Sequence, residues 1–311
     1  MISFVIPVYR SAESLPELHR RIVAVFAKYD GGFEIVFVED CGGDNSWDVI
    51  AQLAEADPRV RGFRMSRNYG QHNALLCGIR QARGEVIVTL DDDLQHPPEE
   101  IPKLLAKLQE DTDVVYGPPA KEKHGLLRSL ASQITKFALE GAMGAENARN
   151  VSALRVFRTR LREAFGDYRS PTVNLDVLLT WGTTKFSVVR VRHEDRRFGE
   201  SGYSTRQLVR HALNMMTGFS TRPLKLASLT GFGFALFGVL VLVYVLAQWI
   251  LHGSAVPGFA FLASIIAIFS GAQMMAVGVM GEYLARMHLR TMERPAYVVA
   301  AQTSQKDESA S

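Results

Sequence analysis

Two long stretches near the C-terminal end contain no charged side chain, and they limit the folds open to this chain more than any other feature. They run from Leu226 to Ile250 and from Gly258 to Gly281. Each is longer than the ~20 apolar residues that an α-helix needs to cross a bilayer core. The alternative, a buried helix of a soluble protein, seldom reaches this length without a polar stripe. The sequence therefore predicts two transmembrane helices.

Positive charge predicts how these helices are oriented. The basic residues near them lie before the first stretch and after the second, whereas the connecting loop, His252–Pro257, has no Lys or Arg. Loops rich in Lys and Arg stay in the cytoplasm. No secretory signal precedes Ile2, so we expect the N-terminal domain and both termini to be cytoplasmic. The basic residues are Arg222, Lys225, Arg286, Arg290 and Arg294.

Upstream of the two stretches, short apolar runs alternate with helical patterns. Such alternation predicts an α/β fold with a Rossmann-like, mostly parallel sheet and helices on both faces. The 311 residues suffice for one such domain of about 200 residues beside the membrane helices. The runs are Ile2–Val8, Leu15–Ala27, Phe33–Val38, Trp47–Ala54, Val60–Met65, Ala74–Ala82 and Val86–Leu90.

Composition excludes some partners and assigns no role to the cysteines. The net charge of +3 is small and there is no basic stripe with interleaved aromatics, so nucleic acid is not an expected partner. Anionic lipid headgroups fit better. Cys41 and Cys77 lack metal-ligand spacing, and we assign them no chemistry.

Polar residues follow three predicted strands, at the edge where parallel sheets bind their ligands. These are Pro7–Tyr9 after the first strand, Glu39–Asp40 after the second, and Asp91–Gln95 after Val86–Leu90. We expect the three groups to converge on one crevice.

The acidic group predicts a divalent metal site. Three successive carboxylates would repel one another in a dry crevice unless a cation neutralised them. Strand alternation predicts that Asp91 and Asp93 point to the same side, with Gln95 as a further ligand. Such oxygen ligands suit Mg²⁺ or Mn²⁺, which also takes oxygens from a bound diphosphate. The alternative is an acidic turn that caps the helix starting at Pro97–Glu100.

Two amphipathic segments leave a choice between the domain and the bilayer surface. Leu126–Gly141 has apolar residues at three-to-four spacing and basic residues elsewhere, and Leu208–Phe219 resembles it. Packing on the sheet is favoured slightly, and an interfacial position is the alternative.

Together these motifs resemble the inverting family 2 glycosyltransferases of GT-A fold, in particular polyprenyl-phosphate glycosyltransferases such as dolichyl-phosphate mannose synthase and undecaprenyl-phosphate aminoarabinose transferase. The resemblance extends nearly end to end. Its segments are Val5–Tyr9, Glu39–Asp40, Arg67–His72, Asp91–Pro98, Arg196–Ser201 and Gly281–Tyr283.

The resemblance implies roles for individual residues. It implies that the nucleotide is bound by Pro7, Tyr9, Asp40 and Asp91, and that Mg²⁺ or Mn²⁺ is held by Asp91, Asp93 and Gln95. It further implies that Asp93, Arg155 and Arg196 are catalytic, with the two arginines near phosphate groups. A guanidinium suits a phosphate, although a lone surface arginine is the alternative for Arg155. The acceptor phosphate would be held by Arg196, Arg197, Ser201 and Arg206.

Two departures from the family pattern affect these expectations. Arg10–Ser11 stands where the family has Asn-Glu, so a carboxylate contact to the nucleotide is missing or is supplied by Glu13. Gly202 stands where the family often has Lys, and Arg197 or Arg206 could substitute for that cation.

The implied function is transfer of one sugar from a nucleotide-sugar, expected to be UDP-linked, to a polyprenyl phosphate at the cytoplasmic face of a bacterial inner membrane. The acceptor phosphate is already ionised near neutral pH, so no dedicated base is required. One alternative is a processive polysaccharide synthase, but two spans are too few for a channel and the Gln-x-x-Arg-Trp motif of that family is missing. Another is a non-catalytic nucleotide-sugar-binding membrane protein. A homo-oligomer is left open.

The expected organisation has four parts. Residues 1–204 would form the GT-A domain and 205–224 a juxtamembrane interface helix. Residues 225–285 would hold the two transmembrane helices. Residues 286–311 would be a cytoplasmic segment with a disordered tail from Gln302 onward.

Overall fold

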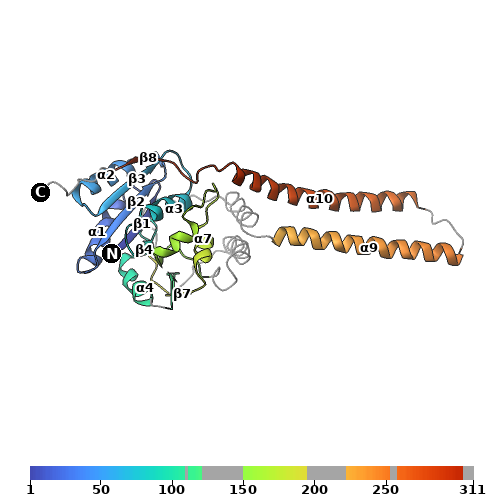
Figure 1. The fold of residues 1–311 in the computed structure, drawn as a ribbon, viewed down its shortest axis with the longest axis horizontal. Helices are drawn as coiled ribbons and strands as arrows, with labels where there is room; N and C mark the ends of the chain where they lie inside the picture. Colours follow the sequence, from blue (N-terminus) through green and yellow to red (C-terminus); the bar gives the residue numbers. More distant parts are fainter. Residues whose placement is uncertain (109–110, 121–149, 195–221, 253–257, 304–311) are drawn as a thin grey trace.

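The computed structural model describes residues 1–108, 111–120, 150–194, 222–252 and 258–303. These residues form an α/β domain and two long helices that extend from it side by side (Figure 1). The elements of the domain are β1 (Ile2–Val8), α1 (Leu15–Phe26), β2 (Phe33–Glu39), α2 (Ser46–Ala56), β3 (Val60–Met65), α3 (Gln71–Gln81), β4 (Val86–Thr89), η1 (Pro98–Glu100), α4 (Ile101–Lys107), β5 (Val114–Tyr116), β6 (Arg155–Arg158), η2 (Thr159–Phe165), α7 (Leu175–Gly182), β7 (Phe186–Val188) and β8 (Val299–Gln302).

The predicted strands and helices of the first hundred residues are confirmed. Each of the seven apolar runs forms the expected element, with ends that differ by at most a few residues. A helix also begins after Pro97, first as the η1 turn and then as α4. The amphipathic segments Leu126–Gly141 and Leu208–Phe219 lie outside the described residues.

The sheet is mixed and mostly parallel, as expected, because β6 and β8 alone among the described strands run against the others. Its strand order is β7-β5-β6-β4-β1-β2-β3-β8. The centre is parallel, with β1 between β2 and β4 and with β3 beside β2. Strand β6 runs antiparallel to both β4 and β5, and β8 runs antiparallel to β3. The parallel centre is the part that brings strand ends together at one edge.

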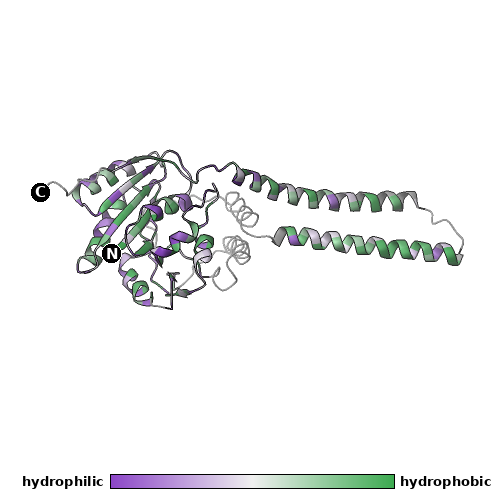
Figure 2. Cartoon of the chain, viewed as in Figure 1, coloured by the Kyte–Doolittle hydropathy of each residue, from purple (hydrophilic) through white to green (hydrophobic). Residues whose placement is uncertain are grey.

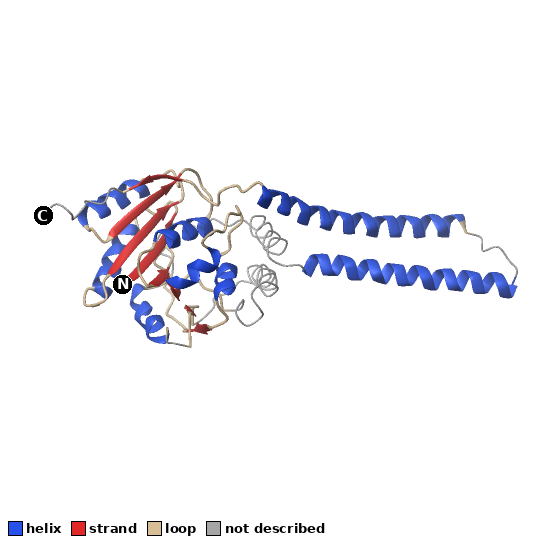
Figure 3. Ribbon diagram, in the orientation of Figure 1, coloured by secondary structure: helices blue, strands red, loops and turns tan. Residues whose placement is uncertain are grey.

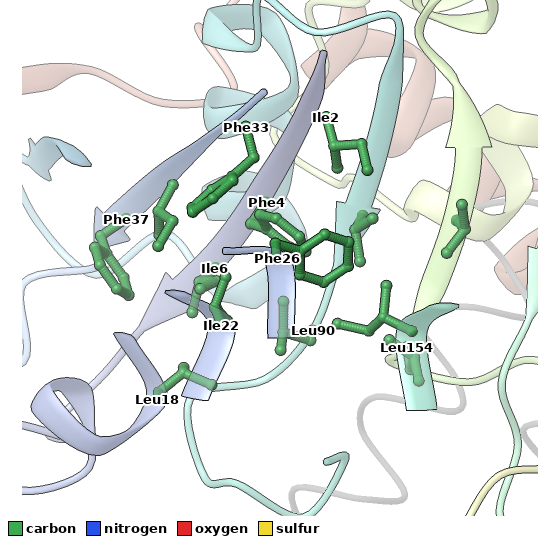
Figure 4. Packing of buried hydrophobic residues seen from close by; sticks show 14 of the residues in the cluster. Ile2, Phe4, Ile6, Leu18, Ile22, Phe26, Phe33, Phe37, Leu90 and Leu154 are labelled. Carbon is green, nitrogen blue, oxygen red and sulfur yellow. The ribbon is translucent and has the colours of Figure 1, made fainter. Parts of the chain in front are cut away.

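Helices cover both faces of the sheet (Figure 3). Strand β1 supplies side chains to the hydrophobic cores on both faces. Phe4 and Ile6 face α1, α2 and α4, and Phe4 lies 4.9 Å from Phe26 of α1 between ring centroids (Figure 4). Val5 points to the opposite face and packs with α3, η2 and α7. This alternation follows from the period of two in a strand that is buried on both sides. The central strands are therefore held in register by two cores.

The two projecting helices are α9 (Arg222–His252) and α10 (Phe259–Thr291). Figure 2 shows apolar residues along most of the length of both. Among the described residues, one helical stretch, Leu224–Leu251, has the length and mean hydropathy (2.4) to cross a bilayer, and the apolar 18-residue window within it has no buried residue. The first predicted span is thus a helix of suitable length. The second lies in α10, and its crossing of a bilayer stays a prediction.

The segment after α10 returns to the domain, which the sequence did not indicate. Strand β8 pairs with β3 at the edge of the sheet. Thr303 extends this contact, because its backbone N donates to Gly62 O at 3.0 Å and its Oγ1 accepts from Gly62 N at 2.9 Å. Gln302 was expected to begin a disordered tail and instead ends this strand, and residues 304–311 lie outside the described part.

Candidate active site

The carboxyl ends of three adjacent strands, β1, β2 and β4, meet at one edge of the sheet, and backbone contacts join them there. Asp40 N, after β2, donates to Val8 O of β1 at 2.9 Å. Tyr9 N, after β1, donates to Oδ2 of Asp92, beyond β4, at 3.1 Å. The expected convergence of Tyr9, Asp40 and the acidic run is therefore present in the structure.

Asp40 binds the turn that leads into α3. Its two carboxylate oxygens accept from Tyr69 N and Gly70 N, both at 2.7 Å. Gly70 has a φ of +94°, a conformation that side chains with a Cβ rarely adopt, so this double contact requires glycine there. Burial raises the pKa of Asp40, although the two backbone hydrogen bonds lower it. The Asp40 side chain is almost fully buried. Its two hydrogen bonds hold the turn before α3 at the edge where the nucleotide is expected to bind.

Arg10 and Ser11, which depart from the family pattern, form a brace between the ends of β1 and β2. Arg10 has a φ of +55°, and its Nε donates to Gly42 O at 2.9 Å. Its guanidinium lies 5.3 Å from the ring centroid of Tyr9, which is 46% exposed and so accessible for stacking. Ser11 N donates to Ser46 Oγ at 3.0 Å. Arg10 and Ser11 thus hold the loop after β1 in place, and the Tyr9 ring stays partly exposed to solvent.

A carboxylate that sequence reasoning missed lies beside this brace. Asp44 Oδ2 accepts from Ser46 Oγ at 2.7 Å and from Ala12 N at 3.4 Å. Its other oxygen, Oδ1, is buried and has no hydrogen-bond partner among the described residues. Glu13, the substitute that the sequence suggested, is exposed. Asp44 is therefore the better structural candidate for the missing acidic group.

The acidic run lies in the turn after β4, so its side chains follow the turn and not the alternation of a strand. Strand β4 ends at Thr89, and Leu94 within the turn has a φ of +60°. Asp91 Oδ1 accepts from Gln71 Nε2 at 2.6 Å, and Asp93 Oδ1 accepts from Gln95 N at 3.1 Å. The three aspartates therefore have different partners.

Asp92 faces back into the β1 loop. Its location raises the pKa of the carboxyl to about 6, because burial outweighs the hydrogen bonds from Ser11 and Tyr9 N. The two neighbours, Asp91 and Asp93, remain as the carboxylates that could face a ligand.

The residues at this edge fit a divalent cation shared with a ligand. Within the described residues, no group of three or more His, Cys, Asp and Glu side chains is arranged to hold a metal by itself. The available donors, from Asp91, Asp93 and Gln95, are oxygens, which suit Mg²⁺ or Mn²⁺. A cation held by few protein ligands characteristically completes its shell with phosphate oxygens and water.

His96, which follows the acidic turn, packs against His193. The rings lie edge to face with centroids 5.0 Å apart, and His96 Nε2 lies 3.4 Å from Ser152 Oγ. Burial, together with the nearby His193, lowers the pKa of His96 to about 4. The imidazole is therefore neutral at neutral pH and adds no charge to the site.

Arg155 is buried, so its alternative interpretation as a surface arginine is wrong. It is 4% exposed, and its Nε and Nη2 donate to the two oxygens of Asp176 at 2.7 and 2.9 Å. Its Nη1 lies 3.3 Å from Thr89 Oγ1. Burial alone would raise the pKa of Asp176, but the charge of Arg155 outweighs it and lowers that pKa. Asp176 is a second residue that sequence reasoning missed.

The residues expected to bind the acceptor phosphate lie outside the described part of the chain. Arg196, Arg197, Ser201, Gly202 and Arg206 lie outside the described residues, so their contacts are unassigned. Pro7 lies in β1, opposite Val38 of β2, next to the exposed Tyr9.

Comparison with known proteins gives a consistent picture along the whole chain. Residues 3–168 match the family model described as "Glycosyl transferase family 2". Proteins named undecaprenyl-phosphate 4-deoxy-4-formamido-L-arabinose transferase from Shewanella sediminis and Pseudomonas aeruginosa are each 35% identical to the chain. The matches cover 96% of this chain in both cases, and 91% and 89% of those proteins.

Solved structures share the fold at low sequence identity. Glucosyl-3-phosphoglycerate synthase from Mycobacterium tuberculosis, crystallised with Mn²⁺, UDP-glucose and glycerol 3-phosphate, aligns with a TM-score of 0.52 over 70% of this chain and 80% of its own, at 18% identity. Mannosyl-3-phosphoglycerate synthase from Rubrobacter xylanophilus aligns with a TM-score of 0.50 over 83% of this chain and 78% of its own, at 15% identity. These likenesses establish a GT-A-like fold for the domain.

Proposed function

The chain belongs to glycosyl transferase family 2 and is a glycosyltransferase, and we propose that it transfers one sugar from a nucleotide-sugar to a polyprenyl phosphate at the cytoplasmic face of the membrane. The donor is UDP-linked, the reaction is an inverting displacement, and the product is a polyprenyl-phosphate sugar. The observation that carries this proposal is the convergence of Tyr9, Asp40 and Asp91 at one edge of a domain that also bears an apolar helix of membrane-spanning length.

The donor side of the site is formed by the ends of β1 and β2. The exposed ring of Tyr9 offers a stacking surface for a base, and Pro7 lies beside it. Asp40 accepts two backbone hydrogen bonds, which fix the position of its carboxylate. We assign this carboxylate to the part of the site that binds the ribose. Asp44 has one buried carboxylate oxygen that accepts no hydrogen bond within the described part of the chain, and this oxygen supports a contact to a ribose hydroxyl in place of the family's Glu.

The diphosphate side is formed by the turn after β4. Asp91, Asp93 and Gln95 hold Mg²⁺ or Mn²⁺ together with the donor diphosphate. The cation, when bound, supplies charge stabilisation for the departing nucleotide diphosphate. Gln71 Nε2 donates to Asp91 Oδ1 at 2.6 Å and so fixes the orientation of the carboxylate that would bind the cation. Asp93 is the catalytic residue of this turn.

The acceptor side needs positive charge and no base. A phosphate monoester carries roughly −1.5 to −2 charge near pH 7, so its oxygen is already nucleophilic. We assign its binding to Arg196, Arg197, Ser201 and Arg206. Among the described residues at the converging strand ends, the buried His96 is neutral, which agrees with a reaction that depends on orientation and charge.

The membrane helices bring the acceptor to the site. Both domain-side ends carry basic residues, Arg222 and Lys225 at the start of α9 and Arg286 and Arg290 near the end of α10 (Figure 1). This arrangement supports two spans with the domain and both termini in the cytoplasm of a bacterium. The hydrocarbon tail of a polyprenyl phosphate stays in the bilayer, and only its phosphate would reach the domain.

The test is a transfer assay with purified full-length protein in detergent, polyprenyl phosphate, Mg²⁺ and a panel of labelled nucleotide-sugars. The panel includes UDP-4-deoxy-4-formamido-L-arabinose, because that sugar is in the name of the relatives from Shewanella sediminis and Pseudomonas aeruginosa. We expect label from one donor to enter the lipid phase only when polyprenyl phosphate is present. Label that never enters the lipid phase with any donor would contradict the proposal.

A further inference from the structure

A buried ion pair lies directly behind the acidic turn, in a place where the proposed reaction has no ligand. Arg155 begins β6 and stands opposite Thr89, the last residue of β4. Asp176 lies in the first turn of α7. The two residues are 4% and 2% exposed.

The guanidinium of Arg155 bridges α7 and β4. Its Nε and Nη2 form a bidentate contact with the carboxylate of Asp176, at 2.7 and 2.9 Å. Its Nη1 donates to Thr89 Oγ1 at 3.3 Å and to Ala153 O at 3.1 Å. Thr89 Oγ1 in turn donates to Ala153 O at 3.0 Å. All three nitrogens are thus engaged inside the domain.

Asp176 is held from two further directions. The Tyr116 hydroxyl donates to its Oδ1 at 3.1 Å, and Tyr116 is a fully buried residue of β5. The backbone N of Leu175 donates to His72 Nδ1 at 3.2 Å, which attaches the start of α7 to α3. The residue before His72 is Gln71, which donates to Asp91. The pair therefore connects with the acidic turn through β4 on one side and through α3 on the other.

Stability alone does not account for such a pair. Removing two charges from water is costly, and a buried ion pair is often no more stabilising than apolar side chains of the same volume. The charge of Arg155 also reaches the site, because the negative charges of Asp176 and then Asp91 raise its pKa against the effect of burial. The pair contacts Thr89, the last residue of β4 and two positions before Asp91, so a fixed backbone and a nearby positive charge both act on that carboxylate.

We propose that Arg155 and Asp176 are positioning residues that fix the end of β4 and thereby hold Asp91 ready to bind a divalent cation. This proposal rests on the metal site of the proposed function. It assigns Arg155 to the support of the diphosphate side and not to direct contact with a substrate phosphate. Thr89 transmits the effect, because it is the only described residue that both belongs to β4 and bonds to Arg155 in the contacts above.

The experiment measures binding of Mn²⁺ to the full-length protein in detergent with saturating UDP, which supplies the diphosphate oxygens that the site shares, by the electron paramagnetic resonance signal of Mn²⁺ relative to a sample with UDP and no protein. The first variant, R155M/D176L, replaces the ion pair by apolar side chains of similar size. The second, Thr89→Val, keeps the pair and removes the Thr89 hydroxyl, with its bonds to Arg155 Nη1 and Ala153 O. We expect Mn²⁺ affinity to fall at least about tenfold in the first and about threefold in the second, by analogy with other residues that orient metal ligands from behind.

A matched control separates this effect from general destabilisation. Arg61 and Glu34 form another buried pair, with Nη1 to Oε2 at 3.0 Å, near the opposite ends of β2 and β3. We expect R61M/E34Q to retain the Mn²⁺ affinity of the wild type even where its melting temperature falls. Circular dichroism identifies any variant that fails to fold, and Thr89→Val then carries the test.

Three results would overturn the proposal. Wild-type Mn²⁺ affinity in folded R155M/D176L or in Thr89→Val would mean that the pair only fills the core. Equal loss in the R61M/E34Q control would mean that any destabilisation weakens the site. Absence of Mn²⁺ binding by the wild type would remove the metal from the proposed function as well, whereas sugar transfer to the lipid would still test the remainder of that function separately.

Discussion

Asp91, Asp92 and Asp93 are consecutive in the sequence, yet their carboxylates have different partners. Gln71 contacts Asp91, the Tyr9 backbone contacts Asp92, and the Gln95 backbone contacts Asp93. Because Asp92 is used to join two loops, a substitution there would disturb the fold of the site. Asp93 Oδ1 accepts from the Gln95 backbone within the same turn, and an asparagine at this position keeps an oxygen that can accept the same bond.

We therefore predict that Asp93→Asn abolishes sugar transfer, by about 100-fold or more, while the protein stays folded. The amide keeps the size of the side chain and removes the charge needed to bind a cation. Transfer rates and melting temperature are measured together, with the exposed turn residue Asp30→Asn as control. Transfer within threefold of the wild type would exclude Asp93 from the metal site.

Sequence reasoning located the residues at the strand ends better than those behind them. Tyr9, Asp40 and Asp91 could be grouped because neighbouring parallel strands end at the same edge. Asp176 could not be paired with Arg155, because the path of residues 159–174 between them has no periodicity that fixes where α7 begins. Asp44 was missed because it lies after β2, whereas the acidic residue of the family pattern is expected on the loop after β1.

At the scale of elements, the fit of α3 on the sheet depends on one glycine. A Cβ at Gly78 would overlap Val5 Cγ1 and would lie 3.1 Å from Val38 Cγ2. The helix backbone therefore packs directly on β1 and β2. The turn before α3 binds Asp40, and the first residue of α3, Gln71, binds Asp91, so the position of α3 on the sheet also sets the geometry of the site.

We predict that Gly78→Ala destabilises the protein by about 1–3 kcal/mol, the usual cost of overpacking a core. Helix propensity alone predicts the opposite sign, since Ala is about 1 kcal/mol better than Gly inside a helix. The free energy of unfolding is compared with that of Gly271→Ala in α10, where no atom lies within 4 Å of the added Cβ. Val5→Ala should relieve part of the loss in a double variant. A rise in stability for Gly78→Ala would contradict the close packing.

The elements that could not be predicted are those that pair across long sequence separations. Strands β5 and β7 have three residues each, too short for a pattern. Strand β8 pairs with β3 across more than 230 residues, and its sequence, Val299–Gln302, has no feature that names a partner. The antiparallel pairings of the sheet come from β6 and β8, and strands of four residues have no pattern that indicates their direction.

At the scale of the whole molecule, strand β8 ties the C-terminal end of α10 back to the domain. The chain leaves the domain before α9 and returns after α10 to pair with β3 (Figure 1). The domain is therefore connected to the helix pair at two points. Two connections restrict how the domain can turn relative to the helices, which would keep the site facing the bilayer surface.

We predict that the loop between the two helices lies outside the cytoplasm. In a Cys41→Ser background, Ser254→Cys should react with a membrane-impermeant thiol reagent in intact cells, because the loop has no Lys or Arg to retain it inside. Met292→Cys, at the exposed end of α10 next to the domain, is the control and should react only after permeabilisation. Labelling of Ser254→Cys only in permeabilised cells would reverse this topology.

The central claim is that one sugar is joined to one polyprenyl phosphate, and the mass of the lipid product tests it most directly. Full-length protein is incubated with the active nucleotide-sugar, Mg²⁺ and a polyprenyl phosphate of defined length, and the lipid phase is analysed by mass spectrometry. We predict a single new lipid that equals the acceptor plus one sugar residue, with its one phosphate retained. A ladder of added sugars would indicate a processive synthase, and unchanged acceptor with every donor would indicate a binding protein. Either result would contradict the account.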